Sequence, residues 1–388
     1  MNDKPEEIHK ILIVCSTLDL DYPYGATPYL WQLYKGLSEA GWDVIITPYR
    51  GRPIRSLWWR CYKNPCRVEG NLFASIMRHF PQRFSTNSKK SGITTRIANY
   101  WVRPKWEKHI LNILRIEKDI EAVLFVTVPL NHLKGITKNI KKKYDIPLIY
   151  YDVDVPISLL KVGGFSFNSY VGSDVSEYDG FIIPSENYVP ILKEMGAKKV
   201  FVLHFGVDPQ VYYPLNFNKD IDIFFFGNRS EDREEYLKMM VSEPSRFLNL
   251  KIQVSGRLLF GDFGNANLIP MVPFNSFKNY CCRSKINLNI VRNLQATSFT
   301  SISRPFELAA LECCVVSAPH KGLDKWFRMG KEMFMVENSK EAIETYKWLI
   351  DDAETRMKVG KAARRRVLEE HTITNRCNQL LKVISGLK

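Results

Sequence analysis

The sequence lacks several features that mark common classes of protein. Its 388 residues contain no apolar run of about 18 residues, the length that a membrane-spanning helix needs. They contain no G-x-G-x-x-G, so a dinucleotide site is not indicated. The eight cysteines form no C-x-x-C pair, and the adjacent ones do not have the spacing of zinc ligands. We therefore expect buried thiols in a reducing compartment, with no bound metal and no cofactor.

Length and composition indicate a globular protein with two domains. A chain of 388 residues is long for one hydrophobic core, and 45% hydrophobic with 25% charged residues is ordinary for a globular protein. Residues 1–7 are polar, partly acidic and lead directly into a predicted strand, which does not match a secretory signal. The expected location is the cytoplasm.

Acidic residues are scarce in one segment. Residues 50–109 contain fourteen Lys and Arg but only two acids, Glu69 and Glu107, so this segment carries +12 of the net charge of +14. Nine aromatic residues are interleaved there. Such a mixture suits an anionic surface, and a solvated basic flank is the alternative. A membrane ranks above nucleic acid as the partner because no nucleic-acid-binding signature occurs elsewhere, and the protein would then be peripheral on the inner face of the membrane.

Two successive series of strand and helix patterns predict an α/β fold with two Rossmann-like doubly wound domains. Short apolar runs rich in β-branched and aromatic residues are typical of buried parallel strands. The predicted strands are residues 10–16, 43–48, 122–128, 147–154, 180–185, 199–204, 221–226, 250–255, 285–290 and 315–318. Predicted helices include 29–37 and about 233–240.

The domain boundaries follow from these series. We expect an N-terminal acceptor domain over residues 1–205 and a proline-bearing linker over 206–219. A donor domain then spans 220–370, and the helical tail 371–388 returns to the N-terminal domain.

Residues 303–319 form the most informative stretch, which is predicted to be a loop, a short helix and a buried strand. Arg304 at the start of the helix favours an anion, because the first N–H groups of a helix are free and its dipole is positive there. Glu307 gains from the same dipole and can accept hydrogen bonds from sugar hydroxyls. The pattern indicates a ligand with both phosphates and hydroxyls.

The same stretch resembles the donor-binding half of the GT-B glycosyltransferases. The resemblance rests on Arg304-Pro305-Phe306-Glu307 with the helix and strand that follow, and on residues 322–327, 330–332 and 364–372. It is most similar to the spore-maturation-protein-like, group 1-type branch. The resemblance covers roughly residues 180–375 well. It implies two Rossmann-like domains that face a cleft, with the C-terminal helix packed back on the N-terminal domain.

The resemblance also implies roles for residues of the donor domain. In the family the glutamate at the position of Glu307 holds the nucleotide ribose, and cations after the first strand neutralise the leaving diphosphate. The implied substrate-binding residues, with the glycine of the first N-terminal loop, are Gly25, Gly227, Arg229, Arg233, Arg304, Phe306, Glu307 and Val272. A salt-bridged surface role is the alternative for Arg229 and Arg233. Many retaining GT-B enzymes carry another glutamate eight residues before the position of Glu307, and this chain has Phe299 there. Whether the transfer retains or inverts the configuration of the sugar therefore stays open.

Three residues are candidates for the catalytic base. Asp152 and Asp154 lie two apart at the end of a predicted strand, so both would point to one side and could orient an acceptor hydroxyl or take its proton. The family often has a histidine near this point, which is absent here, and a turn-forming role beside Pro156 is the alternative. His204 ends the last strand of the first domain, where a structural role is equally open.

The predicted function is a metal-independent glycosyltransferase that moves a sugar from a nucleotide-diphosphate sugar to an acceptor. Metal independence is expected because arginines and helix dipoles can stabilise the leaving diphosphate. An anionic or lipid-linked acceptor would match the basic segment 50–109. A nucleotide-sugar epimerase on the same fold and a non-catalytic binding protein are the alternatives, the latter because of the missing glutamate and histidine.

Overall fold

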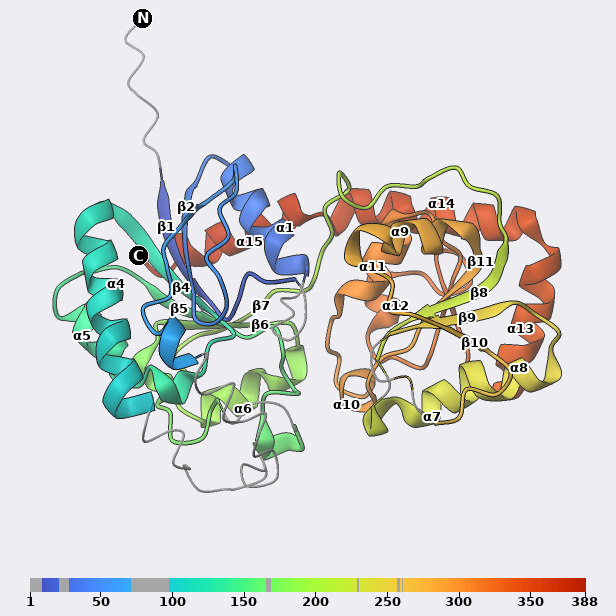
Figure 1. Cartoon of the computed structure of the whole chain (residues 1–388), viewed down its shortest axis with the longest axis horizontal. Coiled ribbons are helices and arrows are strands. Elements are labelled where there is room, and N and C mark those ends of the chain that lie inside the picture. The colour runs from blue at the N-terminus through green and yellow to red at the C-terminus, as the bar shows by residue number, and fades with distance from the viewer. Residues whose placement is uncertain are drawn as a thin grey trace, which may run out of the picture. The chain divides into compact units, whose positions relative to one another are not determined.

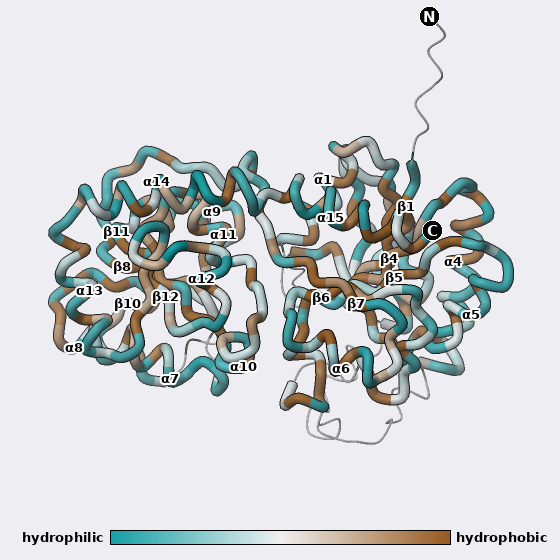
Figure 2. Tube along the Cα trace, turned by 180° about the vertical axis from the view of Figure 1, so that it is seen from behind, coloured by the Kyte–Doolittle hydropathy of each residue, from teal (hydrophilic) through white to brown (hydrophobic). Residues whose placement is uncertain are grey.

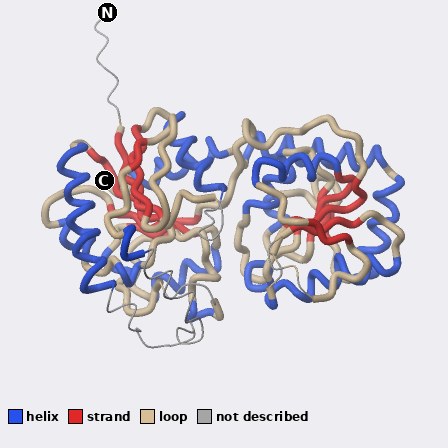
Figure 3. Tube along the Cα trace, in the orientation of Figure 1, coloured by secondary structure: helices blue, strands red, loops and turns tan. Residues whose placement is uncertain are grey.

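The computed structural model describes residues 9–20, 28–70, 98–164, 169–228, 230–256, 259 and 261–388. The chain divides into two compact units. Unit 1 is Met1–Leu203 with Cys377–Lys388, and unit 2 is His204–Arg376. In each unit a parallel sheet lies at the centre and helices surround it (Figures 1 and 3).

The sheet of unit 1 has the strand order β3-β2-β1-β4-β5-β6-β7, and every described pair is parallel. Its strands are β1 (Lys10–Cys15), β2 (Asp43–Pro48), β3 (Arg60–Cys61), β4 (Ile120–Val126), β5 (Leu148–Tyr151), β6 (Gly180–Ile183) and β7 (Val200–Val202). The central strands are apolar on both faces because helices cover both, as the hydrophobic colouring in Figure 2 shows.

The described helices of unit 1 pack around this sheet, and α1 (Pro28–Glu39) is buried over most of its length. They also include α4 (Arg103–Glu117), α5 (Ile136–Lys141) and α6 (Val189–Glu194), with a π-helical turn, η2 (Ala98–Val102), before α4. On α4 the side chains of Trp106, Ile110, Ile113 and Leu114 recur at helical spacing and are buried in the core. Pro104 in the first turn of α4 fits there because the N–H it lacks would have no partner inside the helix.

The sheet of unit 2 has the order β10-β9-β8-β11-β12-β13, again parallel in every described pair. Its strands are β8 (Ile221–Phe226), β9 (Ile252–Ser255), β10 (Asn267–Ile269), β11 (Ser284–Asn289), β12 (Val315–Ser317) and β13 (Phe334–Met335). Its helices are α7 (Glu234–Leu237), α8 (Glu243–Phe247), α9 (Phe274–Arg283), α10 (Asn293–Ala296), α11 (Ser303–Ala310), α12 (Leu323–Trp326), α13 (Ser339–Asp351) and α14 (Ala353–Glu370). Asn338 and Asp352 cap α13 and α14 by accepting hydrogen bonds from first-turn N–H groups.

The predicted α/β fold with two doubly wound domains is confirmed. The sequence pattern missed the short strands β3, β10 and β13, each two or three residues long and at or near a sheet edge. The predicted linker 206–219 lies within unit 2, which begins at His204. The last helix, α15 (Ile373–Ser385), passes from unit 2 into unit 1 at Cys377, whose Sγ contacts the carbonyl oxygen of Leu33 on α1 at 3.7 Å (Figure 1).

Each sheet has one point where the strand order reverses. In unit 1 this point lies between β1 and β4, and in unit 2 between β8 and β11. The loops after two such strands run in opposite directions, which opens a crevice beyond their carboxyl ends where doubly wound proteins bind ligands. We therefore expect a binding site among the residues that follow β8 and β11 in unit 2, or β1 and β4 in unit 1.

Candidate functional site

The loops after β8 and β9 in unit 2 approach each other through glycines. A Cβ atom on Gly256 would lie 2.1 Å from the carbonyl oxygen of Gly227, so no side chain fits between the two loops. A Cβ atom on Gly227 would lie 2.7 Å from the ring of Phe225 and 3.3 Å from Nη1 of Arg233. These glycines therefore let the two loops and the Phe225 and Arg233 side chains pack closely at the end of β8.

Three arginines gather at this end of the unit 2 sheet. Arg233 follows β8, Arg292 follows β11, and Arg304 lies in the first turn of α11. The pKa of Arg233 is lowered to about 10 by burial and by the neighbouring charges of Arg292 and Arg304, which outweigh the opposing charge of Asp232. Its Nη1 donates to the carbonyl oxygen of Asn228 at 2.5 Å, and its Nε has no hydrogen-bond partner among the described residues. A cluster of like charges at a topological switch point is an anion-binding arrangement.

Aromatic rings and one carboxylate hold Arg304 in place. Its guanidinium carbon lies 4.3 Å from the ring centroid of Phe277 and 5.1 Å from that of Phe226. Its Nη1 lies 2.9 Å from Oε2 of Glu307, one helical turn further along α11. The Arg304 side chain is still about one quarter exposed, so it is both fixed and accessible.

Glu307 is buried, with 4% of its surface exposed. Besides Arg304 it accepts a hydrogen bond from the hydroxyl of Tyr212, whose pKa is raised far above its usual value by burial and by the Glu307 charge. The carboxylate is therefore occupied on both sides, and its direct effect is to orient Arg304. A ribose contact, which the resemblance implies for this residue, would have to share these partners.

Two of the predicted site residues pack against a cluster of aromatic side chains around Trp326. Phe306 is fully buried, and its ring packs against Trp326, Phe327 and His371 at centroid distances of 6.0, 5.5 and 5.0 Å. His204 packs edge-on against Trp326 at 5.3 Å. Phe306 has no surface left for a substrate, whereas His204 is half-buried.

A serine holds the segment that contains Val272. The Oγ of Ser255, at the end of β9, donates to the carbonyl oxygen of Pro270 at 3.0 Å and accepts from the N–H of Val272 at 2.9 Å. The Val272 side chain is buried, while its neighbours Met271 and Phe274 are about 40% exposed. Any ligand contact in this segment would fall on the backbone carbonyls and on these two exposed side chains.

In unit 1 the two aspartates of the predicted base have different environments. The carboxylate of Asp152 is buried and accepts hydrogen bonds from Ser158 Oγ, from the Tyr170 hydroxyl and from the N–H of Asp154, at 2.7, 2.7 and 2.9 Å. Burial raises its pKa, and these hydrogen bonds oppose the rise. The geometry therefore favours a structural role for Asp152 in closing the loop after β5. Asp154 is only partly buried and keeps its position at the carboxyl end of that strand.

Two predicted substrate-binding residues, Gly25 and Arg229, lie outside the described residues. Phe299, at the position of the missing family glutamate, has a left-handed backbone with φ of 50°, and Lys325 Nζ lies 5.0 Å above its ring. Where the family has a glutamate carboxylate, this chain thus has the Phe299 ring with the Lys325 ammonium above it.

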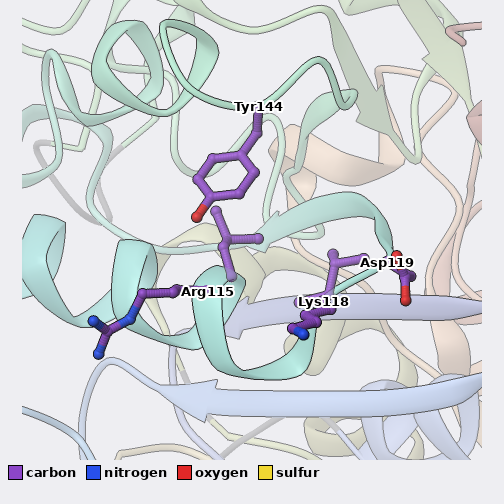
Figure 4. A pocket seen from close by; sticks show the side chains of 6 residues that line it. Arg115, Lys118, Asp119 and Tyr144 are labelled. Atoms are coloured by element: carbon purple, nitrogen blue, oxygen red, sulfur yellow. The ribbon is translucent and has the colours of Figure 1, made fainter.

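The described residues lack two kinds of site and contain one further cavity. They include no group of three or more His, Cys, Asp or Glu side chains that could hold a metal ion, and no helix long and apolar enough to cross a membrane. A cavity of about 370 Å³ lies at the opposite, amino end of β4, beside Arg115, Lys118, Asp119 and Tyr144 (Figure 4). Figure 4 shows that the Arg115 and Asp119 side chains extend in opposite directions, so no polar groups converge there.

Sequence reasoning missed Arg292, Tyr212 and Ser255. Arg292 was within reach of the same rule that selected Arg229, because it follows a predicted strand, 285–290, by two residues. Tyr212 and Ser255 carry no local signal, since their importance comes from contacts with residues 95 and 17 positions away.

Comparisons with known proteins agree with this geometry. Residues 233–382 match the model of the family described as glycosyl transferase-like, and this segment includes Arg233, Arg292, Arg304 and Glu307. No curated protein matches the chain in a sequence comparison.

Solved structures with the same fold cover nearly the whole chain. Sucrose-phosphate synthase from Thermosynechococcus elongatus has a TM-score of 0.66 at 11% identity, over 98% of this chain and 99% of that one. A glycosyltransferase from Rickettsia africae has a TM-score of 0.60 at 12% identity, over 98% of both chains. T4 phage BGT in complex with its UDP-glucose substrate has a TM-score of 0.58 at 13% identity, over 97% of this chain and 99% of that one. The chain therefore has the GT-B fold of glycosyltransferases, and its residues 233–382 carry the pattern of the glycosyl transferase-like family.

Proposed function

We propose that this protein transfers a sugar from a nucleotide-diphosphate sugar to an acceptor. The observation that carries the proposal is the cluster of Arg233, Arg292 and Arg304 beyond β8 and β11, within the segment that matches the glycosyltransferase family. One of the structural relatives is a complex with UDP-glucose, which supports a nucleotide sugar as the donor. The name of no relative identifies the acceptor of this chain.

In the proposed mechanism the arginines bind the diphosphate of the donor and stabilise the charge that develops on it as the glycosidic bond breaks. Arg304 is held by Glu307 and by two aromatic rings, so little reorganisation is needed when the leaving group forms. Together the three arginines would supply the positive charge that a divalent metal provides in other enzymes. We therefore expect sugar transfer to persist in EDTA, and a requirement for Mg²⁺ or Mn²⁺ would contradict this part of the proposal.

The role of Glu307 is tested by comparing two ligands. Replacement of Glu307 by Ala should weaken nucleoside diphosphate binding by about 1–3 kcal/mol, the scale of lost hydrogen bonds to a charged group. If Glu307 acts by orienting Arg304, the affinity for inorganic pyrophosphate falls as well. If it binds ribose, pyrophosphate affinity stays and only the nucleotide is affected. Unchanged nucleotide affinity in a folded Glu307→Ala protein would remove Glu307 from the site.

Two assays separate the transferase from its alternatives. A transferase releases free nucleoside diphosphate in step with a glycosylated acceptor, whereas an epimerase converts the donor and releases none. A non-catalytic binding protein would bind nucleotide without turnover. The protein is incubated with the donor, with and without extracts that contain candidate acceptors. Donor consumption and release of free nucleoside diphosphate are then measured, and together they decide among the three.

A second surface supports membrane association. In the described part of the basic segment, Tyr100 and Trp101 are 79% and 68% exposed, just before the cationic first turns of α4. The ion pair between Lys105 on α4 and Glu69 brings the segment that contains Val68 next to α4. The Val68 side chain is 78% exposed. Exposed aromatic side chains among cations suit the interface of an anionic bilayer.

Vesicle co-sedimentation tests this surface. Binding should require anionic lipid, weaken with salt and fall in a Tyr100→Ser, Trp101→Ser protein. The matched control is Trp348→Ser, which removes a 48% exposed tryptophan from unit 2. Binding that is indifferent to lipid charge and to salt would exclude this role.

A further inference from the structure

Beyond the nucleotide site, the carboxyl edge of the unit 1 sheet brings Tyr49, Arg50 and His132 together. Tyr49 and Arg50 follow β2 directly, and their N–H groups donate to the carbonyl oxygens of Cys15 and Ser16 at 2.7 and 2.9 Å. His132 lies in the loop after β4. Because β1 lies between β2 and β4, the three residues lie at the carboxyl edge of the sheet, beside the point where the strand order of unit 1 reverses.

The ring of His132 is held by a tyrosine that is itself fixed. The Tyr49 hydroxyl and His132 Nδ1 are 2.7 Å apart. The Tyr49 ring stacks on Trp106 with a centroid distance of 5.3 Å, and Asn64 Nδ2 donates to the Tyr49 carbonyl oxygen at 2.8 Å. The direction of the imidazole is therefore set by the core of unit 1.

The hydrogen-bond pattern assigns the tautomer of His132. Burial raises the pKa of Tyr49, so its hydroxyl keeps its proton, and the described residues offer that proton no acceptor other than His132 Nδ1. Burial, helped by the charge of Arg50, lowers the pKa of His132 to about 4, so the ring is neutral at pH 7. A neutral imidazole that accepts at Nδ1 carries its proton on Nε2. Within the described part of the chain, this Nε2–H has no acceptor.

Arg50 adds a positive charge beside this donor. Its side chain is exposed, and among the described residues it forms no ion pair with a carboxylate, whereas the nearby Arg52 lies 3.8 Å from Asp19. Arg50 is close enough to affect the titration of both Tyr49 and His132. This edge of the unit 1 sheet thus carries a guanidinium and an imidazole N–H from two different loops.

We propose that Arg50 and the Nε2–H of His132 bind a phosphate group carried by the acceptor. This inference rests on the proposed function, since only a transferase has an acceptor. A phosphate offers several oxygens, so it can take a bidentate contact from Arg50 and a further hydrogen bond from His132 at once. A neutral acceptor hydroxyl would leave the Arg50 charge unused. In this assignment His132 is a donor that recognises the acceptor and does not take its proton.

The experiment is an NMR titration of the ¹⁵N-histidine-labelled full chain with inorganic phosphate. His132→Gln identifies the signal, and we expect Nδ1 unprotonated, Nε2 protonated and a saturable shift on addition of phosphate. In Arg50→Ala the phosphate concentration for half saturation should rise about tenfold or more. Arg55→Ala, which removes another exposed arginine of the same segment, is the matched control and should titrate like the parent.

Several results would overturn the inference: a proton on His132 Nδ1, no response of the His132 signal to phosphate, or an equal response in Arg50→Ala. Nucleoside diphosphate binding by the same Arg50→Ala protein separates the two proposals. If nucleotide binds normally but the His132 signal ignores phosphate, the acceptor site is wrong and the donor site stands. If neither the parent nor the Arg50→Ala protein binds nucleoside diphosphate, the proposed function itself fails.

Discussion

At the scale of single residues, Glu312 ends α11 in a conformation that glycine usually adopts. Its φ is 57°, in the left-handed region. The N–H groups of Glu312 and Cys313 donate to the carbonyl oxygens of Ala309 and Leu308, at 3.0 and 3.1 Å. This is the Schellman arrangement, in which the residue after the C-cap is usually glycine because a Cβ is strained there.

Glu312→Gly should therefore be more stable than Glu312→Ala, which is the reverse of the usual order in a helix. Both remove the weak, partly exposed pair with Arg364, whose atoms are 3.6 Å apart, so their difference isolates the backbone. We expect the glycine protein to be the more stable by about 1 kcal/mol, although alanine is the better residue in most helices. Urea denaturation of the two proteins measures this, and a more stable alanine protein would contradict the left-handed assignment.

The candidate site shows what residue types can and cannot reveal. Arg304 and Glu307 were found from the sequence because both lie in one helical turn, where spacing fixes their proximity. Arg292 joins them only because β11 pairs with β8, and sequence spacing does not carry that information. Phe306 was selected with its neighbours by resemblance, but the side of α11 on which it lies faces the core.

At the scale of elements, α14 packs on the end of α11 through a glycine. A Cβ on Gly360 would lie 2.2 Å from the carbonyl oxygen of Glu312, which belongs to the backbone and cannot rotate away. The two helices must therefore separate if the position gains a side chain.

Gly360→Ala should destabilise the protein by about 1–3 kcal/mol, the cost of overpacking, despite the higher helix propensity of alanine. Lys361→Ala, at the next and exposed position of α14, is the control and should change stability by less than about 0.5 kcal/mol. Thermal unfolding of both proteins provides the comparison. Equal stability of Gly360→Ala and the parent would mean that the two helices are not in such close contact.

Long, strongly apolar elements were predictable, and short edge elements were not. The central strands β1, β4 and β8 are recognisable because each is buried on both faces and is mostly apolar. β11 alternates polar and apolar residues, and its Asn287 and Asn289 are buried as well. β3, with the sequence Arg60-Cys61, and β13 exist through pairing with a neighbouring strand, so their residues carry little signal of their own.

At the scale of the whole molecule, two buried histidines of unit 2 predict sensitivity to acid. Burial lowers the pKa of His320 to about 4, and burial with the neighbouring Arg376 lowers that of His371 to about 3. Unfolded histidines titrate near pH 6.5, so below this pH the unfolded state binds protons that the folded state refuses. The stability from these two groups is complete above about pH 6.5 and is lost as the pH falls towards their folded pKa values.

The midpoint of thermal unfolding should therefore fall steeply between pH 6.5 and pH 4, with each histidine contributing up to about 1.4 kcal/mol per pH unit. His320→Gln and His371→Asn should lower stability at pH 7 but flatten this dependence. His9→Gln, which changes an exposed side chain, should leave the slope as it is. Parallel curves for all four proteins would show that the buried histidines do not control acid unfolding.

The central claim is that the arginines beyond β8 and β11 bind the diphosphate of a nucleotide sugar. The most direct test is isothermal titration of the full chain with the five common nucleoside diphosphates, alongside Arg292→Ala, Arg304→Ala and the exposed control Lys340→Ala. The account predicts that one nucleotide binds the parent and the control equally, and that each arginine substitution weakens binding by about 1.5–3 kcal/mol. Binding that survives both arginine substitutions, or no binding of any nucleoside diphosphate, would contradict it.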